Sequence, residues 1–311
     1  MGLPRTGSGS VRGSKADGGG SEHYHCYSSS WGPCPTKRAR DGLQTHSRTS
    51  GLSDMPPRLR DMISVLGLTA FAALSLCLAM RQETIVSIER LELTLEPRPW
   101  PFADQQRAGI NDHFSKLRRD KPALWNGRIL LLHNYAINGT VFRGQFFETD
   151  YASFLAWRDW DIPDPTVQNC FAMGAIKCTD GAFILGIMGD HTANAGRIYF
   201  PCGMTDPQSV DGKSVNLEAS LWREVTEETG LTSADLTAAP YWHTLFHGPR
   251  IAHIRILHAR EGADTLRSHI LANLALEDQP ELADIHIVRR RGDFHPRIEP
   301  HVATFLNWVM D

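Results

Sequence analysis

Three glutamates stand close together in the segment SLWREVTEETGL, residues 220–231. Glu224, Glu227 and Glu228 are spaced i, i+3 and i+4, which places their side chains on one face of an α-helix. Like charges at these spacings repel by roughly 0.2–0.5 kcal/mol per pair. Converging carboxylate oxygens are also the ligands that Mg²⁺ or Mn²⁺ accepts, with water completing the octahedron. Such a metal polarises phosphoryl oxygens and lowers the pKa of water for attack on phosphorus.

The elements around these glutamates are expected to form one amphipathic helix. A mostly apolar stripe beside the acids can bury against a sheet; it comprises Leu217, Leu221, Val225 and Thr229. Asn216 is well placed as the N-cap, and Gly230 as the residue that ends the helix. Arg223 reaches one carboxylate, but one cation does not balance three acids. Spacing alone therefore favours a solvated acidic face, because glutamate-rich surface helices are common.

The order of residue types favours the metal site instead. REVTEETGL, residues 223–231, matches the second half of the Nudix signature, R-E-U-x-E-E-x-G-U with U aliphatic, at every specified position. The strands and the Pro-Gly turn predicted over residues 174–203 also resemble those that precede this box in Nudix hydrolases. The chain therefore resembles the Nudix family over roughly residues 170–288.

The resemblance implies an α/β fold, a Nudix-type α/β/α sandwich with a mixed sheet. It implies that Glu224, Glu227 and Glu228 hold Mg²⁺ or Mn²⁺, and that Arg223 orients them by ion pairing. Glu227 is also assigned to the catalytic set. The implied activity is hydrolysis of the diphosphate linkage in a small-molecule nucleoside diphosphate derivative, such as a nucleoside diphosphate sugar or an ADP-ribose-like compound.

The front half of the signature departs from the family. The full pattern, G-x5-E-x7-R-E, places its glutamate at Val215 and its glycine at Ser209. Gly203 lies twenty residues before Arg223 instead of fourteen, so that the loop is about six residues longer than the pattern requires. This departure favours the alternative function, a Nudix-like regulatory module that binds a nucleotide without turning it over.

Further residues are candidates for catalysis and substrate binding. A general base must deprotonate the attacking water. Glu281, just before a predicted strand, is the first candidate and Glu277 the second; an ordinary loop acid is the alternative for both. Arg197, in the turn before the Pro-Gly element, can clamp a diphosphate with two hydrogen bonds, or else faces solvent. Gly203, in that element, is assigned to the same binding site.

The chain before residue 83 differs in character from the rest. Residues 1–57 are rich in Gly, Ser and Arg and are predicted to be disordered. Residues 58–82 contain an uncharged stretch, 62–80, which is long enough to span a bilayer of roughly 30 Å. It is a membrane anchor, a secretory signal that starts at Met55, or untranslated sequence before a true start at Met80. The catalytic domain is accordingly expected in the cytoplasm or anchored to a membrane.

The remainder divides into a small α+β subdomain, residues 83–164, and the Nudix domain, residues 165–311. Residues 124–128, LWNGR, loosely resemble the leading subdomain of nucleoside-diphosphate-sugar Nudix hydrolases. Residues 99–102, PWPF, echo a motif of NADH-cleaving members, but they precede the box and are interpreted as packing of this subdomain.

Local patterns predict the elements of the α+β subdomain. Alternation over residues 85–95 predicts one strand, and residues 104–117 a helix. Asn138 and Gly139 predict a two-residue hairpin turn in which both residues have positive φ.

Charge and cysteine content narrow the class of protein. A formal net charge of −3 over 311 residues gives no electrostatic footprint for nucleic acid. The six cysteines include no C-x-x-C pair, which fits a reduced catalytic domain without structural zinc. The sequence leaves the oligomeric state open.

Overall fold

The computed structural model describes residues 83–122 and 124–311. The predictions for residues 1–57 and for the uncharged stretch 62–80 lie outside the described residues. Within the described part, no helix is both long and apolar enough to cross a membrane.

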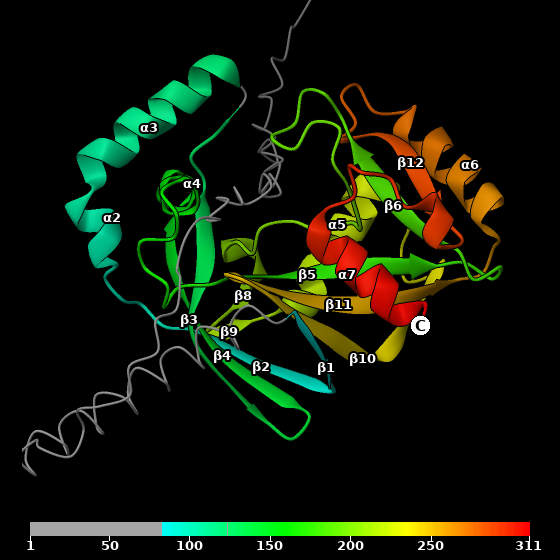
Figure 1. Cartoon of the computed structure of the whole chain (residues 1–311), viewed down its shortest axis with the longest axis horizontal. Coiled ribbons are helices and arrows are strands. Elements are labelled where there is room, and N and C mark those ends of the chain that lie inside the picture. The colour runs from blue at the N-terminus through cyan, green and yellow to red at the C-terminus, as the bar shows by residue number, and fades with distance from the viewer. Residues whose placement is uncertain (1–82, 123) are drawn as a thin grey trace, which may run out of the picture.

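A mixed seven-stranded sheet lies at the centre of the described chain (Figure 1). Its strand order is β1-β10-β11-β5-β6-β12, and β7 pairs with β6. Strand β11 runs parallel to β5, whereas the other pairs are antiparallel. The strands are β1 (Thr84–Ile88), β5 (Asn169–Lys177), β6 (Phe183–Met188), β7 (Ile198–Tyr199), β10 (Leu236–His247), β11 (Arg250–Ala259) and β12 (Leu282–Val288).

A second mixed sheet has five strands in the order β3-β4-β2-β9-β8. Strands β2 and β4 are parallel, and the remaining pairs are antiparallel. The two shortest strands come from the loop that leads into the glutamate helix, so this loop is tied to the second sheet. The strands are β2 (Arg90–Leu95), β3 (Arg128–Asn138), β4 (Val141–Asp150), β8 (Val210–Asp211) and β9 (Ser214–Val215).

The single strand predicted over residues 85–95 is wrong, because the segment forms β1 and β2. Strand β1 pairs with β10 in the first sheet, and β2 pairs with β4 in the second. The chain bends at Glu89, whose backbone N–H donates to the carbonyl of Thr140 at 2.8 Å. Alternation of apolar residues continues through the bend, so it does not reveal where the chain changes its pairing partner. The boundary proposed between residues 164 and 165 stays a prediction.

The hairpin prediction is confirmed, but its turn lies one residue later than predicted. Asn138 pairs with Val141, which leaves Gly139 and Thr140 as the two turn residues. Gly139 has φ +59°, whereas Asn138 does not have positive φ. A glycine at the first central position is the arrangement of a type II′ hairpin turn.

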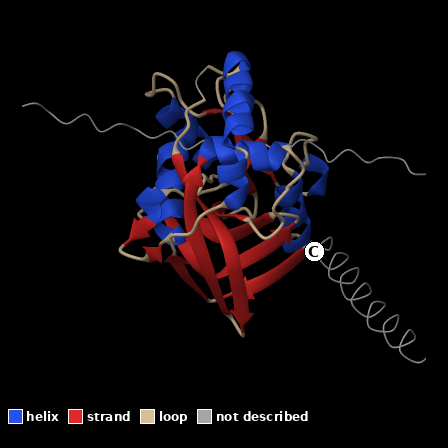
Figure 2. Ribbon diagram, turned by 90° about the vertical axis from the view of Figure 1, so that its left-hand side faces the viewer, coloured by secondary structure: helices blue, strands red, loops and turns tan. Residues whose placement is uncertain are grey.

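Six α-helices surround the two sheets in the described part of the chain: α2 (Pro101–Gln105), α3 (Arg107–Asp120), α4 (Tyr151–Asp159), α5 (Leu217–Thr229), α6 (Ala263–Leu274) and α7 (Pro300–Val309). The helix predicted over residues 104–117 is thus two helices, α2 and α3. Helix α5 packs on β5 through its apolar stripe, and α7 packs on β10. Figure 2 shows the strands gathered toward one end of the molecule and most helices toward the other. The predicted α/β architecture with a mixed sheet is confirmed.

A separate aromatic core holds the N-terminal helices against the second sheet. Trp100 is 4% exposed, and its ring lies 5.6 Å from that of Phe147 and 6.5 Å from that of Trp157. Its indole N–H donates to Asp164 Oδ2 at 3.0 Å. The interpretation of PWPF as a packing element is therefore confirmed.

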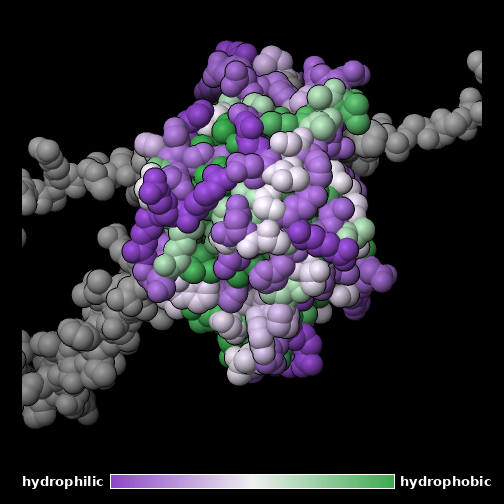
Figure 3. Space-filling view, turned by 90° about the vertical axis from the view of Figure 1, so that its right-hand side faces the viewer, coloured by the Kyte–Doolittle hydropathy of each residue, from purple (hydrophilic) through white to green (hydrophobic). Residues whose placement is uncertain are grey.

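On the side of the molecule that carries α6 and β12, hydrophilic side chains predominate at the surface (Figure 3). Apolar residues show there in small, separated areas between the polar ones.

Local capping sets the ends of α5 as predicted. The side chain of Asn216 accepts a hydrogen bond from the backbone N–H of Ala219 at 3.0 Å, and Gly230 ends the helix with φ +73°. We expect Asn216→Ala to lower the free energy of unfolding by about 1 kcal/mol, because a helix N–H loses its acceptor. Urea unfolding measures this, with Asn216→Asp as the control that keeps an acceptor oxygen. Equal losses in both variants would contradict the capping role.

Candidate functional site

Two of the three predicted metal ligands on α5 point into the molecule. Glu224 and Glu228, one helical turn apart, are each only 2% exposed, whereas Glu227 lies on the exposed side. Glu228 Oε1 accepts a hydrogen bond from the backbone N–H of Cys202 at 3.2 Å. Its other oxygen, Oε2, is buried and has no hydrogen-bond partner within the described residues. The helix therefore buries acidic groups, which rules out a wholly solvated acidic face.

Gly203 makes room for the carboxylate of Glu224. A Cβ atom at position 203 would lie 2.3 Å from Glu224 Cδ, a distance that real Cβ contacts do not show. Only glycine therefore allows the backbone after β7 to approach this carboxylate. The residue assigned by sequence to substrate binding lies directly against a predicted metal ligand.

Glu281 joins the acids of α5 from a different element. It immediately precedes β12, and its carbonyl accepts a hydrogen bond from the N–H of Gly189 at 2.8 Å. Burial, together with the charges of Glu227 and Glu277, raises the pKa of Glu281 to about 7. The strands of the first sheet thus bring the predicted general base to the predicted metal ligands. Glu277 lies farther out, in the exposed loop after α6.

The acids are electrostatically coupled. The pKa of Glu224 is raised to about 8, chiefly by burial; the charge of Arg223 opposes the shift, and the charges of Glu227 and Glu281 contribute to it. Burial also raises the pKa of Glu228 well above its usual value, and the charges of Glu281 and Glu224 contribute. Each buried carboxyl therefore binds its proton more tightly because of its neighbours, and a cation placed among them would reverse this effect.

Arg223 holds two carboxylates, one of which the sequence did not indicate. Its Nη2 lies 3.2 Å from Glu224 Oε1, as the resemblance implies, and 3.3 Å from Asp206 Oδ1. Asp206 is 5% exposed and also accepts from the N–H of Gln208 at 3.0 Å, which caps the 3₁₀ turn η1 (Pro207–Ser209). The lengthened loop therefore supplies an acid to Arg223. Its only sequence signal is an Asp-Pro pair of the kind that starts turns.

Val215, where the full signature has glutamate, is a buried residue of β9 with 4% of its surface exposed. It belongs to the main apolar core. A glutamate there would require a partner for a buried charge, so this stretch of the loop serves packing instead.

Arg197, which immediately precedes β7, contacts an acid that does not belong to α5. Its Nη1 is 3.3 Å from Glu299 Oε1, and its side chain is 31% exposed. Glu299, which the sequence did not indicate, is the N-cap residue of α7 and is 2% exposed. The arginine predicted to clamp a diphosphate is thus partly accessible and partly engaged by an internal acid.

The carboxylates of this site are chemically suited to bind a divalent cation. Carboxylate oxygens are the ligands that Mg²⁺ prefers, and Glu228 Oε2 is a buried oxygen without a partner in the described chain. As the side chains of the described residues stand, no group of three or more His, Cys, Asp or Glu residues is positioned to hold a metal ion. The site is therefore a set of facing carboxylates and not an assembled coordination shell.

No family model matches the sequence, and no curated protein matches it. Among solved structures, the chain is similar to a Nudix hydrolase from M. smegmatis, RenU, with 18% identity, 45% of this chain and 83% of that chain covered, and a TM-score of 0.30. It is also similar to the MutT protein from Methanosarcina mazei Go1, with 20% identity, 31% and 67% of the two chains covered, and a TM-score of 0.21.

The burial of Glu224 predicts a particular pH dependence of stability. Because its folded pKa of about 8 exceeds the usual 4.5, the folded state holds a proton that the unfolded state releases between these pH values. The free energy of unfolding therefore falls as the pH rises through this window. Glu224→Gln removes this contribution, so that between pH 4 and pH 8 the variant should lose less stability than the wild type, by roughly 4 kcal/mol.

Urea unfolding of the metal-free protein at both pH values measures the difference. Glu218→Gln is the matched control, since Glu218 lies in the first turn of the same helix with an exposed side chain. We expect this control to keep the wild-type loss. A Glu224→Gln variant that behaves like the control would show that Glu224 is not buried as the structure describes.

Proposed function

We propose that the protein is a Nudix-type hydrolase that cleaves the diphosphate linkage of a nucleoside diphosphate derivative, such as a nucleoside diphosphate sugar or an ADP-ribose-like compound. One observation carries the proposal: Glu224 and Glu228 are buried side by side, on the helix that bears REVTEETGL, facing Glu281. Burying several like charges is unfavourable unless a counter-charge accompanies them. A cation bound among these carboxylates would supply the counter-charge and would also attract an anionic substrate.

The residues of the site divide the chemical work. Mg²⁺ or Mn²⁺, when held by Glu224, Glu227 and Glu228, supplies positive charge that polarises a phosphoryl group and acidifies water. Arg223 keeps the carboxylate of Glu224 in place through their ion pair. Glu281, with its pKa raised to about 7 by burial, can accept a proton near neutral pH.

The reaction that follows from these roles is a displacement at phosphorus. The oxygen of water forms a bond to one phosphorus atom of the diphosphate while the bond from that atom to the bridging oxygen breaks. Glu281 takes the proton of the water, and the bridging oxygen leaves with the other phosphate. Arg197, in this proposal, binds the diphosphate through its accessible guanidinium edge.

Turnover tests the proposal directly. The full-length protein is incubated with a panel of nucleoside diphosphate derivatives and Mg²⁺, and released phosphomonoester is detected with a coupled phosphatase. We expect turnover that depends on the metal. Glu281→Gln should lower it by about 10²–10⁴-fold, the contribution of a general base. Glu227→Gln and Glu228→Gln should each cost more than the roughly 10–100-fold that second-shell changes cost at metal sites.

Glu218→Gln serves again as the control and should retain the wild-type rate. Nucleotide binding without turnover on the whole panel would refute the hydrolase and support the regulatory module. Wild-type rates in Glu227→Gln and Glu228→Gln would refute the assignment of the site.

The Gly203→Ala variant tests whether the site can be disturbed while the fold is kept. The three atoms nearest to the added methyl group all belong to the end of the Glu224 side chain, so we expect the carboxylate to move and the fold to remain. Turnover should fall by at least about tenfold, because a small misplacement of a catalytic group has a large effect on rate. Gly262→Ala is the control, since a Cβ atom there has its nearest neighbours at 3.8 and 4.0 Å. Equal rates in both variants would contradict the role of Gly203.

A further inference from the structure

Arg223 and Glu224 are consecutive residues of α5, yet they form an ion pair. Side chains at neighbouring positions of a helix point in directions about 100° apart and do not face each other. The Arg223 side chain must therefore turn around the helix to bring its Nη2 to within 3.2 Å of Glu224 Oε1. Holding a long side chain in one such conformation costs entropy, which a second contact at the guanidinium offsets.

Asp206 supplies this second contact. Its Oδ1 lies 3.3 Å from the same Nη2 of Arg223, so that one nitrogen is held between two carboxylates. Asp206 belongs to the lengthened loop and not to α5, and it is buried. An ionised carboxylate removed from water in this way requires a cation nearby, and Arg223 is the cation that contacts it.

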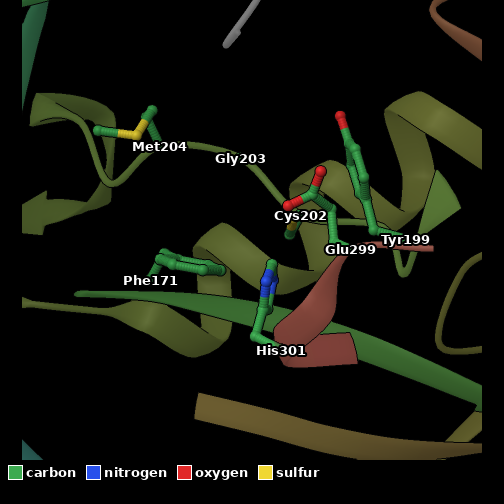
Figure 4. Close-up of a pocket in the computed structure, with 7 residues that line it drawn as sticks. All are labelled: Phe171, Tyr199, Cys202, Gly203, Met204, Glu299 and His301. Carbon is green, nitrogen blue, oxygen red and sulfur yellow. The ribbon is translucent and has the colours of Figure 1, made fainter. Parts of the chain in front are cut away.

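The backbone around Asp206 is held by both sheets. The loop that carries it starts at the segment 202–204, which lines the small pocket of Figure 4. The next residue, Thr205, is 1% exposed, and its carbonyl accepts from the N–H of Leu130 in β3 at 2.8 Å. Its hydroxyl donates to the carbonyl of Cys170 in β5 at 2.8 Å. Asp206 is therefore fixed from outside α5, as an anchor for a side chain of that helix needs to be.

Capping of the turn η1 does not explain an acid at this position. The Oδ1 atom of Asp206 accepts from the N–H of Gln208 at 3.0 Å, and asparagine or serine would accept this hydrogen bond as well. Only an acid gives Arg223 a counter-charge. The front half of the signature contributes none, because Val215 is part of the apolar core. The negative charge of Asp206 is therefore explained by Arg223 and not by the turn.

We propose that Asp206 is a positioning residue of the carboxylate site: it holds Arg223 against Glu224 and so fixes the Glu224 carboxylate for cation binding. The inference rests on the proposed function, in which Glu224 is a metal ligand. Without the charge of Asp206, the guanidinium either leaves Glu224, whose carboxylate then loses its orientation, or pairs with Glu224 alone and competes with the cation for it. Both changes weaken cation binding. The positive charge of Arg223, no longer balanced by Asp206, weakens it further.

Mn²⁺ binding tests this role without requiring turnover. The metal-free full-length protein is titrated with Mn²⁺ alone, and electron paramagnetic resonance measures the free ion. Asp206→Asn keeps an oxygen that caps η1 but removes the charge. We expect it to weaken Mn²⁺ binding by about 10–100-fold, the effect typical of residues that orient metal ligands. Asp211→Asn is the matched control, since Asp211 is an exposed acid of the same loop, in β8. This control should bind Mn²⁺ as the wild type does.

A double-mutant cycle shows whether Asp206 acts through Arg223. In an Arg223→Gln background, Asp206→Asn should change the Mn²⁺ dissociation constant by less than about twofold, because the contact that it removes is already lost. A loss as large as in the wild-type background would overturn the proposal, since Asp206 would then act on the cation directly or through the fold. Undiminished Mn²⁺ affinity in Asp206→Asn would overturn it too, as would the absence of Mn²⁺ binding by the wild type.

Urea unfolding of each variant detects a folding defect. If Asp206→Asn does not fold, Asp206→Ser repeats the test, because serine also caps a turn and carries no charge. The hydrolysis assay separates this proposal from the proposed function. Wild-type hydrolysis and Mn²⁺ affinity in Asp206→Asn would refute the positioning role and leave the reaction standing. Mn²⁺ binding that depends on Asp206, without hydrolysis of any nucleotide, would support the positioning role and refute the reaction.

Discussion

The burial of two acidic side chains one turn apart on α5 is the constraint on which the site depends. Removing a carboxylate from water is unfavourable, and a second one nearby makes it more so. Two groups of the described chain offset this unfavourable burial. Arg223 pairs with Glu224, and the N–H of Cys202 donates to Glu228. One oxygen of Glu228 has no partner within the described chain, so the protein alone does not fully satisfy the pair.

The backbone segment 202–204 connects Glu224 and Glu228 to the rest of the molecule. It follows β7 in the first sheet, and on one side it contacts both buried glutamates of α5. On its other side it borders the pocket formed with the start of α7. Glu281 is fixed separately, by the pairing of β12 with β6 and by the hydrogen bond to Gly189. Elements distant in sequence thus meet at one segment of backbone.

Much of this arrangement follows from local sequence. Asn216 and Gly230 set the ends of α5 because capping involves only neighbouring residues, and the i, i+4 spacing alone puts Glu224 and Glu228 on one face. Whether that face is buried is not a local property. It depends on Gly203, whose missing side chain admits the carboxylate.

The features that sequence reasoning missed all depend on tertiary contacts. The partner of Arg223 in the lengthened loop, Asp206, lies seventeen residues before it, and no periodic pattern connects the two. The partner of Arg197, Glu299, comes from the last helix. The strand predicted over residues 85–95 divides at Glu89 because its halves have partners in different sheets.

The central claim is that the buried carboxylates form a cation site, and proton release on Mg²⁺ binding tests it most directly. At pH 7, Glu224 with its pKa of about 8 still holds a proton in the metal-free protein, and a bound cation should displace it. Isothermal titration calorimetry in two buffers of different ionisation enthalpy counts the protons released. We expect Mg²⁺ to bind with net proton release, and this release to decrease in Glu224→Gln. Binding without proton release, or no binding, would contradict the account.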